Sequence, residues 1–159
     1  MNQPLTITRG EGGYVLESCQ LVAAPREQVF AFFADAFNLD KLTPPWIRFE
    51  IITPPPIEIS EGTLIDYRLR IWGMPIRWRS RIADWQPPCR FVDEQIKGPY
   101  RKWVHEHAFE ADEGHTRIRD RVTYRPPGGA LLNRLLVTPD VKRIFRYRRV
   151  QLRSLFGEG

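Results

Sequence analysis

Apolar and polar residues alternate along most of the chain between residues 47 and 125, as in β-strands with one buried and one solvated face. Ile65, Tyr67 and Leu69, for example, occupy every second position opposite charged residues. Residues rich in glycine and proline separate the runs and predict turns, for instance at residues 73–75. Short connections between consecutive strands favour antiparallel pairing. The seven predicted strands cover residues 14–22, 47–53, 63–72, 76–82, 90–97, 100–111 and 115–125.

Two short helices are predicted between the first and second strands. Pro25 suits the first turn of a helix, and the apolar residues after it favour a helix over residues 25–34. Asp35 is a suitable N-cap for a second helix over residues 35–42, which the prolines that follow bring to an end.

The C-terminal residues predict helix again. Leucines at residues 131–136 indicate a first turn or two, and we expect an interruption at residues 138–140 with Asp140 capping a long final helix. That helix is amphipathic, so its apolar side should pack on the sheet while its basic side faces solvent, or contacts anionic lipid or nucleic acid. Its apolar residues are Val141, Ile144, Phe145, Leu152, Leu155 and Phe156.

Length and composition are those of one globular domain spanning residues 1–159. The apolar content of 42% argues against a disordered chain. Cys19 and Cys89 are the only cysteines, and residues 1–13 lack the basic start and apolar run of a secretion signal, so we expect a cytoplasmic protein. No stretch approaches 18 consecutive apolar residues, so no transmembrane segment is expected.

Positive charge exceeds negative charge, with 24 basic and 19 acidic residues, and 20 of the basic residues are arginine. Many arginines occupy alternate strand positions, as in Arg77, Arg79 and Arg81, which is typical of the solvated outer face of a sheet. A nucleic-acid surface would combine aromatic and basic residues on one exposed face, whereas here the aromatics fall on the opposite face. We therefore expect no nucleic-acid partner.

The last two predicted strands carry side chains that a plain hydrophobic core would not contain. Imidazole, carboxylate, hydroxyl and aromatic groups share faces of neighbouring strands, which indicates the lining of a binding cavity. The residues on these faces are Trp103, His105, His107 and Phe109 on one strand, and Thr116, Ile118, Asp120, Val122 and Tyr124 on the other.

His105, His107 and Asp120 allow several interpretations. A buried aspartate and histidine can satisfy each other's polarity, contact a ligand passively, or move a proton on a bound carbonyl or enol. A metal site would need a further ligand, which Asp93 or Asp120 could supply only in a suitable cross-strand register. The HExxH pattern is absent, and no cysteine pair assists. We therefore expect no metal and no cofactor.

The order of predicted elements resembles the helix-grip fold of the START-like (SRPBCC) superfamily, which includes Bet v 1, polyketide cyclases and lipid-transfer domains. Residues 24–39 are similar to the entry to the first helix pair in bacterial members. Residues 91–124, with Gly98-Pro99-Tyr100, resemble a bacterial ligand-binding subfamily. The resemblance implies an α+β fold in which a curved seven-stranded antiparallel sheet wraps around the C-terminal helix, with a hydrophobic cavity between them.

The resemblance also implies a function. We expect the cavity to bind a small, mostly hydrophobic ligand such as a lipid, polyketide or quinone. The alternative is a cyclase or dehydratase that uses His105 or His107 with Asp120 for acid–base catalysis. Oligomeric state is left open. The predicted ligand-contacting residues are Phe49, Ile65, Tyr67, Leu69, Trp78, Trp103, His105, His107, Phe109, Asp120, Tyr124, Phe145 and Leu152.

Overall fold

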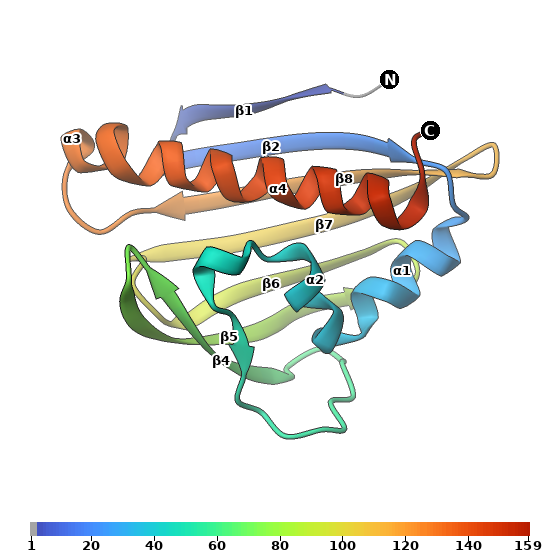
Figure 1. Ribbon diagram of the computed structural model, residues 1–159, viewed down its shortest axis with the longest axis horizontal. Helices are drawn as coiled ribbons and strands as arrows, with labels where there is room; N and C mark the ends of the chain where they lie inside the picture. The colour runs from blue at the N-terminus through green and yellow to red at the C-terminus, as the bar shows by residue number, and fades with distance from the viewer. Residues whose placement is uncertain (1–2) are drawn as a thin grey trace.

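The computed structural model describes residues 3–159 and contains one antiparallel sheet beneath a long helix (Figure 1). The strands are β1 (Gln3–Gly10), β2 (Gly13–Val22), β3 (Glu50–Ile51), β4 (Leu64–Ile71), β5 (Met74–Gln86), β6 (Arg90–Lys97), β7 (Lys102–Asp112) and β8 (His115–Arg125). They are ordered β1-β2-β8-β7-β6-β5-β4-β3, with β1 and β3 as the open edges. The predicted α+β helix-grip architecture is therefore confirmed.

Helices cover one face of the sheet. They are α1 (Arg26–Ala34), the 3-10 turn η1 (Ala36–Asn38), α2 (Leu39–Leu42), the 3-10 turn η2 (Pro45–Ile47), α3 (Ala130–Leu132), the π-helix η3 (Asn133–Val137) and α4 (Thr138–Phe156). Figure 1 shows α4 running lengthwise over β2 and β8, and it contacts β1 and β2, while α1 packs on β7 and β8. Asp35 caps η1 as predicted, because its side chain accepts a hydrogen bond from the Phe37 amide. Within residues 3–159, no helix is long and apolar enough to cross a membrane.

The sheet has eight strands, so the prediction of seven was wrong. The additional strand is β1, whose only aliphatic side chains, Leu5 and Ile7, pack against the core from an exposed edge. Such a short apolar pattern is a weak sequence signal. The glycines after it form the β1–β2 turn, where Gly12 has a positive φ of 72° and Gly13 lies against the backbone of Tyr124.

Two other boundaries differ from the prediction. The β4–β5 turn consists of Trp72 and Gly73, both with positive φ, because Ile71 already pairs with Met74. The turn predicted at residues 73–75 was therefore displaced, and this left-handed two-residue turn matches the twist of the hairpin. The strand predicted over residues 47–53 is reduced to β3, because the prolines before it start η2 instead.

The C-terminal helix is not interrupted at residues 138–140. Thr138 has helical dihedral angles, and the chain passes without a break from α3 through η3 into α4. Asp140 lies in the first turn of α4 and is not its cap, so that prediction was also wrong. Pro139 is tolerated because it lies in the first turn of α4, directly after the wider π-helical turn.

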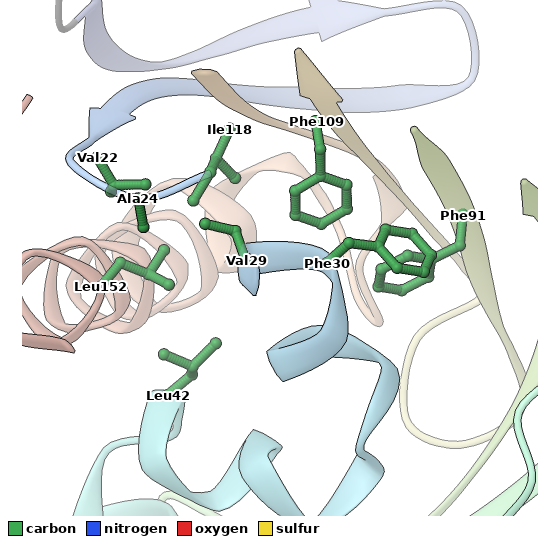
Figure 2. Packing of buried hydrophobic residues seen from close by; sticks show 9 residues of the cluster. All are labelled: Val22, Ala24, Val29, Phe30, Leu42, Phe91, Phe109, Ile118 and Leu152. Atoms are coloured by element: carbon green, nitrogen blue, oxygen red, sulfur yellow. The ribbon is translucent and has the colours of Figure 1, made fainter. Parts of the chain in front are cut away.

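Buried apolar residues form three clusters. Figure 2 shows the first, in which Val29 and Phe30 of α1 pack between the sheet and Leu152 of α4. The second joins β2 and β8 to the start of α4. The third lies at the β3–β5 end of the sheet around Ile65 and Tyr67. Because residues from all three clusters line one cavity, the core is divided around an open space.

The outer face of the sheet carries the predicted arginine rows. Their guanidinium groups pair with carboxylates on neighbouring strands, as Arg79 does with Asp66 at 2.7 Å and Arg119 with Glu110 at 3.1 Å. Both pairs are exposed, so each contributes at most about 1 kcal/mol to stability. Period-two alternation thus separates a charged outer face from the inner face that meets the helices.

Candidate functional site

A cavity of about 220 Å³ lies between the inner face of the sheet and the helices. One buried water needs only about 10–15 Å³, so this space is more than a packing defect. The lining residues are Phe32, Phe33, Asp35, Ala36, Asn38, Leu39, Leu42, Thr43, Ile47, Phe49 and Ile59 from the helices and loops; Ile65, Tyr67, Leu69, Ile71, Trp78, Ser80 and Ile82 from β4 and β5; Phe91, Asp93, Tyr100, Trp103, His105 and His107 from β6, β7 and their turn; and Asp140, Val141, Ile144, Phe145 and Arg148 from α4.

Most of the predicted ligand contacts lie on the wall of this cavity. Those that line it are Phe49, Ile65, Tyr67, Leu69, Trp78, Trp103, His105, His107 and Phe145. Phe109 and Leu152 instead pack in the first core cluster, Tyr124 packs in the second, and Asp120 lies behind the two histidines. Alternation assigns a side chain to a face, but which part of that face a helix covers depends on how α1 and α4 cross the sheet.

A polar cluster closes one end of the apolar cavity. Asp93 of β6 is paired with His105 of β7 in the strand register, and His107 is paired with Asp120 of β8. The hydrogen bonds run diagonally between these pairs, at 2.8 Å from His105 Nε2 to Asp120 Oδ1 and 2.7 Å from His107 Nε2 to Asp93 Oδ2. His107 Nδ1 also lies 3.2 Å from Asp120 Oδ1, so three strands are cross-linked through side chains.

Arg148 completes the cluster from α4. Its Nη2 lies 3.5 Å from Asp120 Oδ1 and 3.3 Å from His107 Nδ1, and only 6% of the residue is exposed. Sequence reasoning missed this residue, although a signal exists: Val141, Phe145, Arg148 and Leu152 follow one another at helical spacing along the buried side of α4. A basic residue in an apolar helical stripe therefore indicates a buried partner.

Aromatic rings fix the position of the imidazoles. The Phe91 ring stacks on His107, with ring centroids 4.1 Å apart and an angle of 17° between the planes. The centroid of the His105 ring lies 3.7 Å from that of His107. The Arg148 guanidinium lies 5.2 Å from the centroid of Phe33. These contacts restrict the polar groups to one arrangement and favour a cation on the ring stacked with Phe91.

The two carboxylates of the cluster are ionised. Burial alone would raise the pKa of Asp120, but Arg148 and the hydrogen bonds from the two histidines hold it well below its usual value. Burial likewise opposes ionisation of Asp93, but its bond to His107 outweighs that effect and lowers its pKa. Arg148 and one imidazolium can therefore be balanced by two negative charges.

The pKa values of the two histidines are shifted in opposite directions. Burial and the neighbouring His107 lower the pKa of His105 to about 4, although Asp120 acts in the opposite direction. Burial would also lower the pKa of His107, but its bonds to Asp120 and Asp93 raise it above the usual value. At neutral pH His105 is therefore neutral, whereas the carboxylates on either side of His107 favour its protonated form.

This protonation pattern leaves specific groups for a ligand. Neutral His105 donates from Nε2 to Asp120, so its Nδ1 carries a lone pair, and no side chain among residues 3–159 donates to that atom. Arg148 hydrogen bonds through Nη2 only, and its Nε is buried without an acceptor. The polar end thus offers one acceptor and unused guanidinium donors.

Asp93, His105 and His107 are also close enough together for a metal ion, with one potential ligand atom from each lying within 4.8 Å of the others. However, Nε2 of both histidines is already bonded to a carboxylate, and the Arg148 guanidinium lies beside His107. A divalent cation would have to displace a proton and approach this fixed positive charge. The geometry fits a hydrogen-bonded network better than a metal centre.

The sequence matches the family model described as polyketide cyclase / dehydrase and lipid transport over residues 22–148. The chain belongs to this family. A search of curated proteins gives no significant match. Solved structures with the same fold include protein Ms6760 from Mycobacterium smegmatis, at 18% identity and a TM-score of 0.69, with 96% of this chain and 97% of that chain covered.

Two further solved structures share this fold. A START superfamily protein from Mycobacterium smegmatis has 11% identity and a TM-score of 0.66, with 90% of this chain and 99% of that chain covered. Ara h 8.0201 has 19% identity and a TM-score of 0.59, with 88% and 97% covered. These TM-scores show that the START-like fold is shared.

Proposed function

We propose that this protein binds a small, mostly apolar molecule in the cavity and holds a polar oxygen of that molecule at the Arg148–His105 end. The observation that carries the proposal is an apolar space of about 220 Å³ closed by a buried polar cluster with unused hydrogen-bonding capacity. Arg148 and His105 both line this space, so a ligand oxygen could accept from the guanidinium and, as a hydroxyl, donate to the imidazole. The family's description, which includes lipid transport, supports the same function.

The charge of the cavity wall favours a neutral ligand. Asp35, Asp93 and Asp140 line the cavity and Asp120 lies directly behind the histidines, whereas Arg148 is the only arginine or lysine among the lining residues. A carboxylate ligand would therefore bring a further negative charge into a wall that already holds several. A hydroxyl or carbonyl group suits the site better, because it can accept from Arg148 and, as a hydroxyl, donate to His105 Nδ1.

The acid–base alternative rests on the same residues but requires different protonation. With a pKa of about 4, His105 is a weak base at neutral pH, and both nitrogens of His107 lie within hydrogen-bonding distance of carboxylates. Binding and orientation are therefore what these groups do best.

The proposal is tested with 1-naphthol and 1-naphthoate, which share an apolar ring system but differ in charge. We expect isothermal titration calorimetry to detect binding of 1-naphthol, and to find 1-naphthoate at least about tenfold weaker because its charge is desolvated beside carboxylates. Leu69→Trp fills the cavity and should abolish binding. Leu64→Trp is the matched control, because Leu64 is on the same strand but 47% exposed on the opposite face.

The two parts of the proposal fail separately. Undiminished 1-naphthol binding by Leu69→Trp would show that the ligand is held outside the cavity. Equal affinity for naphthol and naphthoate would instead disprove the role assigned to the polar end.

A further inference from the structure

The helix formed by α3 and η3 has its apolar side facing outward. Leu131, Leu132, Leu135 and Leu136 are 70%, 36%, 61% and 44% exposed, whereas the side that faces the protein contains Asn133 and Val137, each 2% exposed. A helix that only packed on the sheet would have the reverse arrangement. The function proposed for the cavity does not use these leucines.

The four leucines form one continuous surface, which we call the leucine face. They occupy two adjacent pairs of positions four residues apart, so they lie together on one side of the helix, whereas Asn133 and Val137 face the protein. This helical segment lies at one end of the molecule (Figure 1). A cluster of exposed leucines this compact typically marks an interaction site.

The C-terminal segment that carries the leucine face is rich in positive charge. Residues 125–156 contain eight basic residues and one acidic residue, Asp140. Arg134 is exposed between the leucines, and Arg143 and Arg146 are exposed on the following turns of the continuous helix. A surface that combines exposed leucines with flanking arginines is complementary to an anionic lipid membrane, which offers acyl chains beneath phosphate groups.

An aromatic side chain adds a third feature of membrane-contacting surfaces. Trp46 is 39% exposed, and the Arg143 guanidinium lies 3.9 Å from its ring centroid. The Tyr147 ring also packs against Trp46, with ring centroids 5.8 Å apart. Tryptophan and tyrosine are enriched at the level of lipid headgroups, where an amphipathic ring is favoured.

Other occupants fit the leucine face less well. Roughly half of the combined surface of four leucines is exposed, well under the ~800 Å² per partner that a stable dimer buries. Single-stranded nucleic acid is bound by basic and aromatic side chains, not by leucines. We propose that the leucine face docks on an anionic lipid surface, with the leucines among the acyl chains and Arg134, Arg143 and Arg146 at the phosphates.

The placement of the leucine face gives docking a consequence. Leu136 is followed within two turns of the same helix by Asp140, Val141 and Ile144, which line the cavity. Docking would bring the α4 wall of the cavity close to the membrane. The docking proposal itself rests on exposure and charge alone, so it stands or falls independently of what the cavity binds.

The test is co-sedimentation with phosphatidylcholine vesicles, with or without one third phosphatidylglycerol. We expect binding to the anionic vesicles that weakens as salt is raised. The double variant Leu131→Ser with Leu135→Ser should bind at least about tenfold more weakly, because two exposed apolar side chains are lost. Val150→Ser is the matched control, since Val150 is 58% exposed on α4 but outside the leucine face, and it should bind as the wild type does.

Three outcomes would overturn the proposal: no sedimentation of the wild type with anionic vesicles, equal binding by the double variant, or a dimer in analytical ultracentrifugation that only the double variant loses. Hydrogen exchange of the wild-type chain provides a measurement without substitutions. Amides of residues 130–137 should exchange more slowly on anionic vesicles than in solution, and an unchanged rate would count against docking.

Discussion

Replacing Asp120 by asparagine should remove the charge that holds the polar cluster together. Asp120 is 6% exposed, and its Oδ1 lies 2.8 Å from His105 Nε2, 3.2 Å from His107 Nδ1 and 3.5 Å from Arg148 Nη2. Asparagine has nearly the same size and shape as aspartate, so the substitution leaves no cavity. Any loss of stability therefore reports on the charge.

The size of the effect follows from the charge balance. In the wild type, Asp93 and Asp120 lie beside Arg148 and His107 and favour protonation of His107, whereas in Asp120→Asn only Asp93 remains. Removing one partner of a buried ion pair costs about 3–5 kcal/mol, because the other charge stays buried. Loss of the proton from His107 would relieve part of this cost, so we expect unfolding at pH 7 to become easier by about 3 kcal/mol. That is a large fraction of the ~5–15 kcal/mol that stabilises a typical domain.

Urea denaturation followed by circular dichroism measures this loss. Arg148→Met removes the opposite charge, and in the double variant the two losses should not add, with a coupling energy of at least about 2 kcal/mol. Asp66→Asn is the control, because the Asp66 carboxylate pairs with Arg79 on the exposed face and its loss should cost at most about 1 kcal/mol. A loss below about 1 kcal/mol in Asp120→Asn, or simple additivity in the double variant, would refute the charge argument.

Two further predictions concern acid stability and backbone packing. Because the pKa of His105 is about 4 in the folded protein and near 6.5 when unfolded, the unfolded chain binds more protons between these values, so stability falls as pH drops from 6.5 to 4. In His105→Gln, the free energy of unfolding measured by urea denaturation should fall less steeply between pH 6.5 and 4 than in the wild type. An unchanged dependence on pH would contradict the lowered pKa of His105. Gly13→Ala should lower the free energy of unfolding by about 2–3 kcal/mol, since its Cβ would collide with the Tyr124 carbonyl oxygen across the β2–β8 pair. Gly129→Ala, where the added Cβ meets open space, should change the melting temperature little, and equal shifts for both would rule out the collision.

Local pattern was enough to predict most strands and the side chains on their inner faces. Ile65, Tyr67 and Leu69 line the cavity together, as do His105 and His107, because successive side chains on a strand alternate strictly between two faces. The same rule assigned Phe109 to the inner face correctly, but it could not show that α1 would cover that residue. It also failed at β1, where two apolar side chains on an exposed edge gave too weak a pattern.

The sequence by itself therefore determined the antiparallel sheet, the long amphipathic helix and the orientation of the two histidines, since each follows from a repeat of two or about 3.6 residues. Only the tertiary structure decided that Asp93, His107, Asp120 and Arg148 meet in one buried cluster. The meeting depends on the cross-strand register and on how α4 crosses the sheet. These long-range relations decide which side chains come into contact, and they cannot be predicted from the periodicity of the sequence.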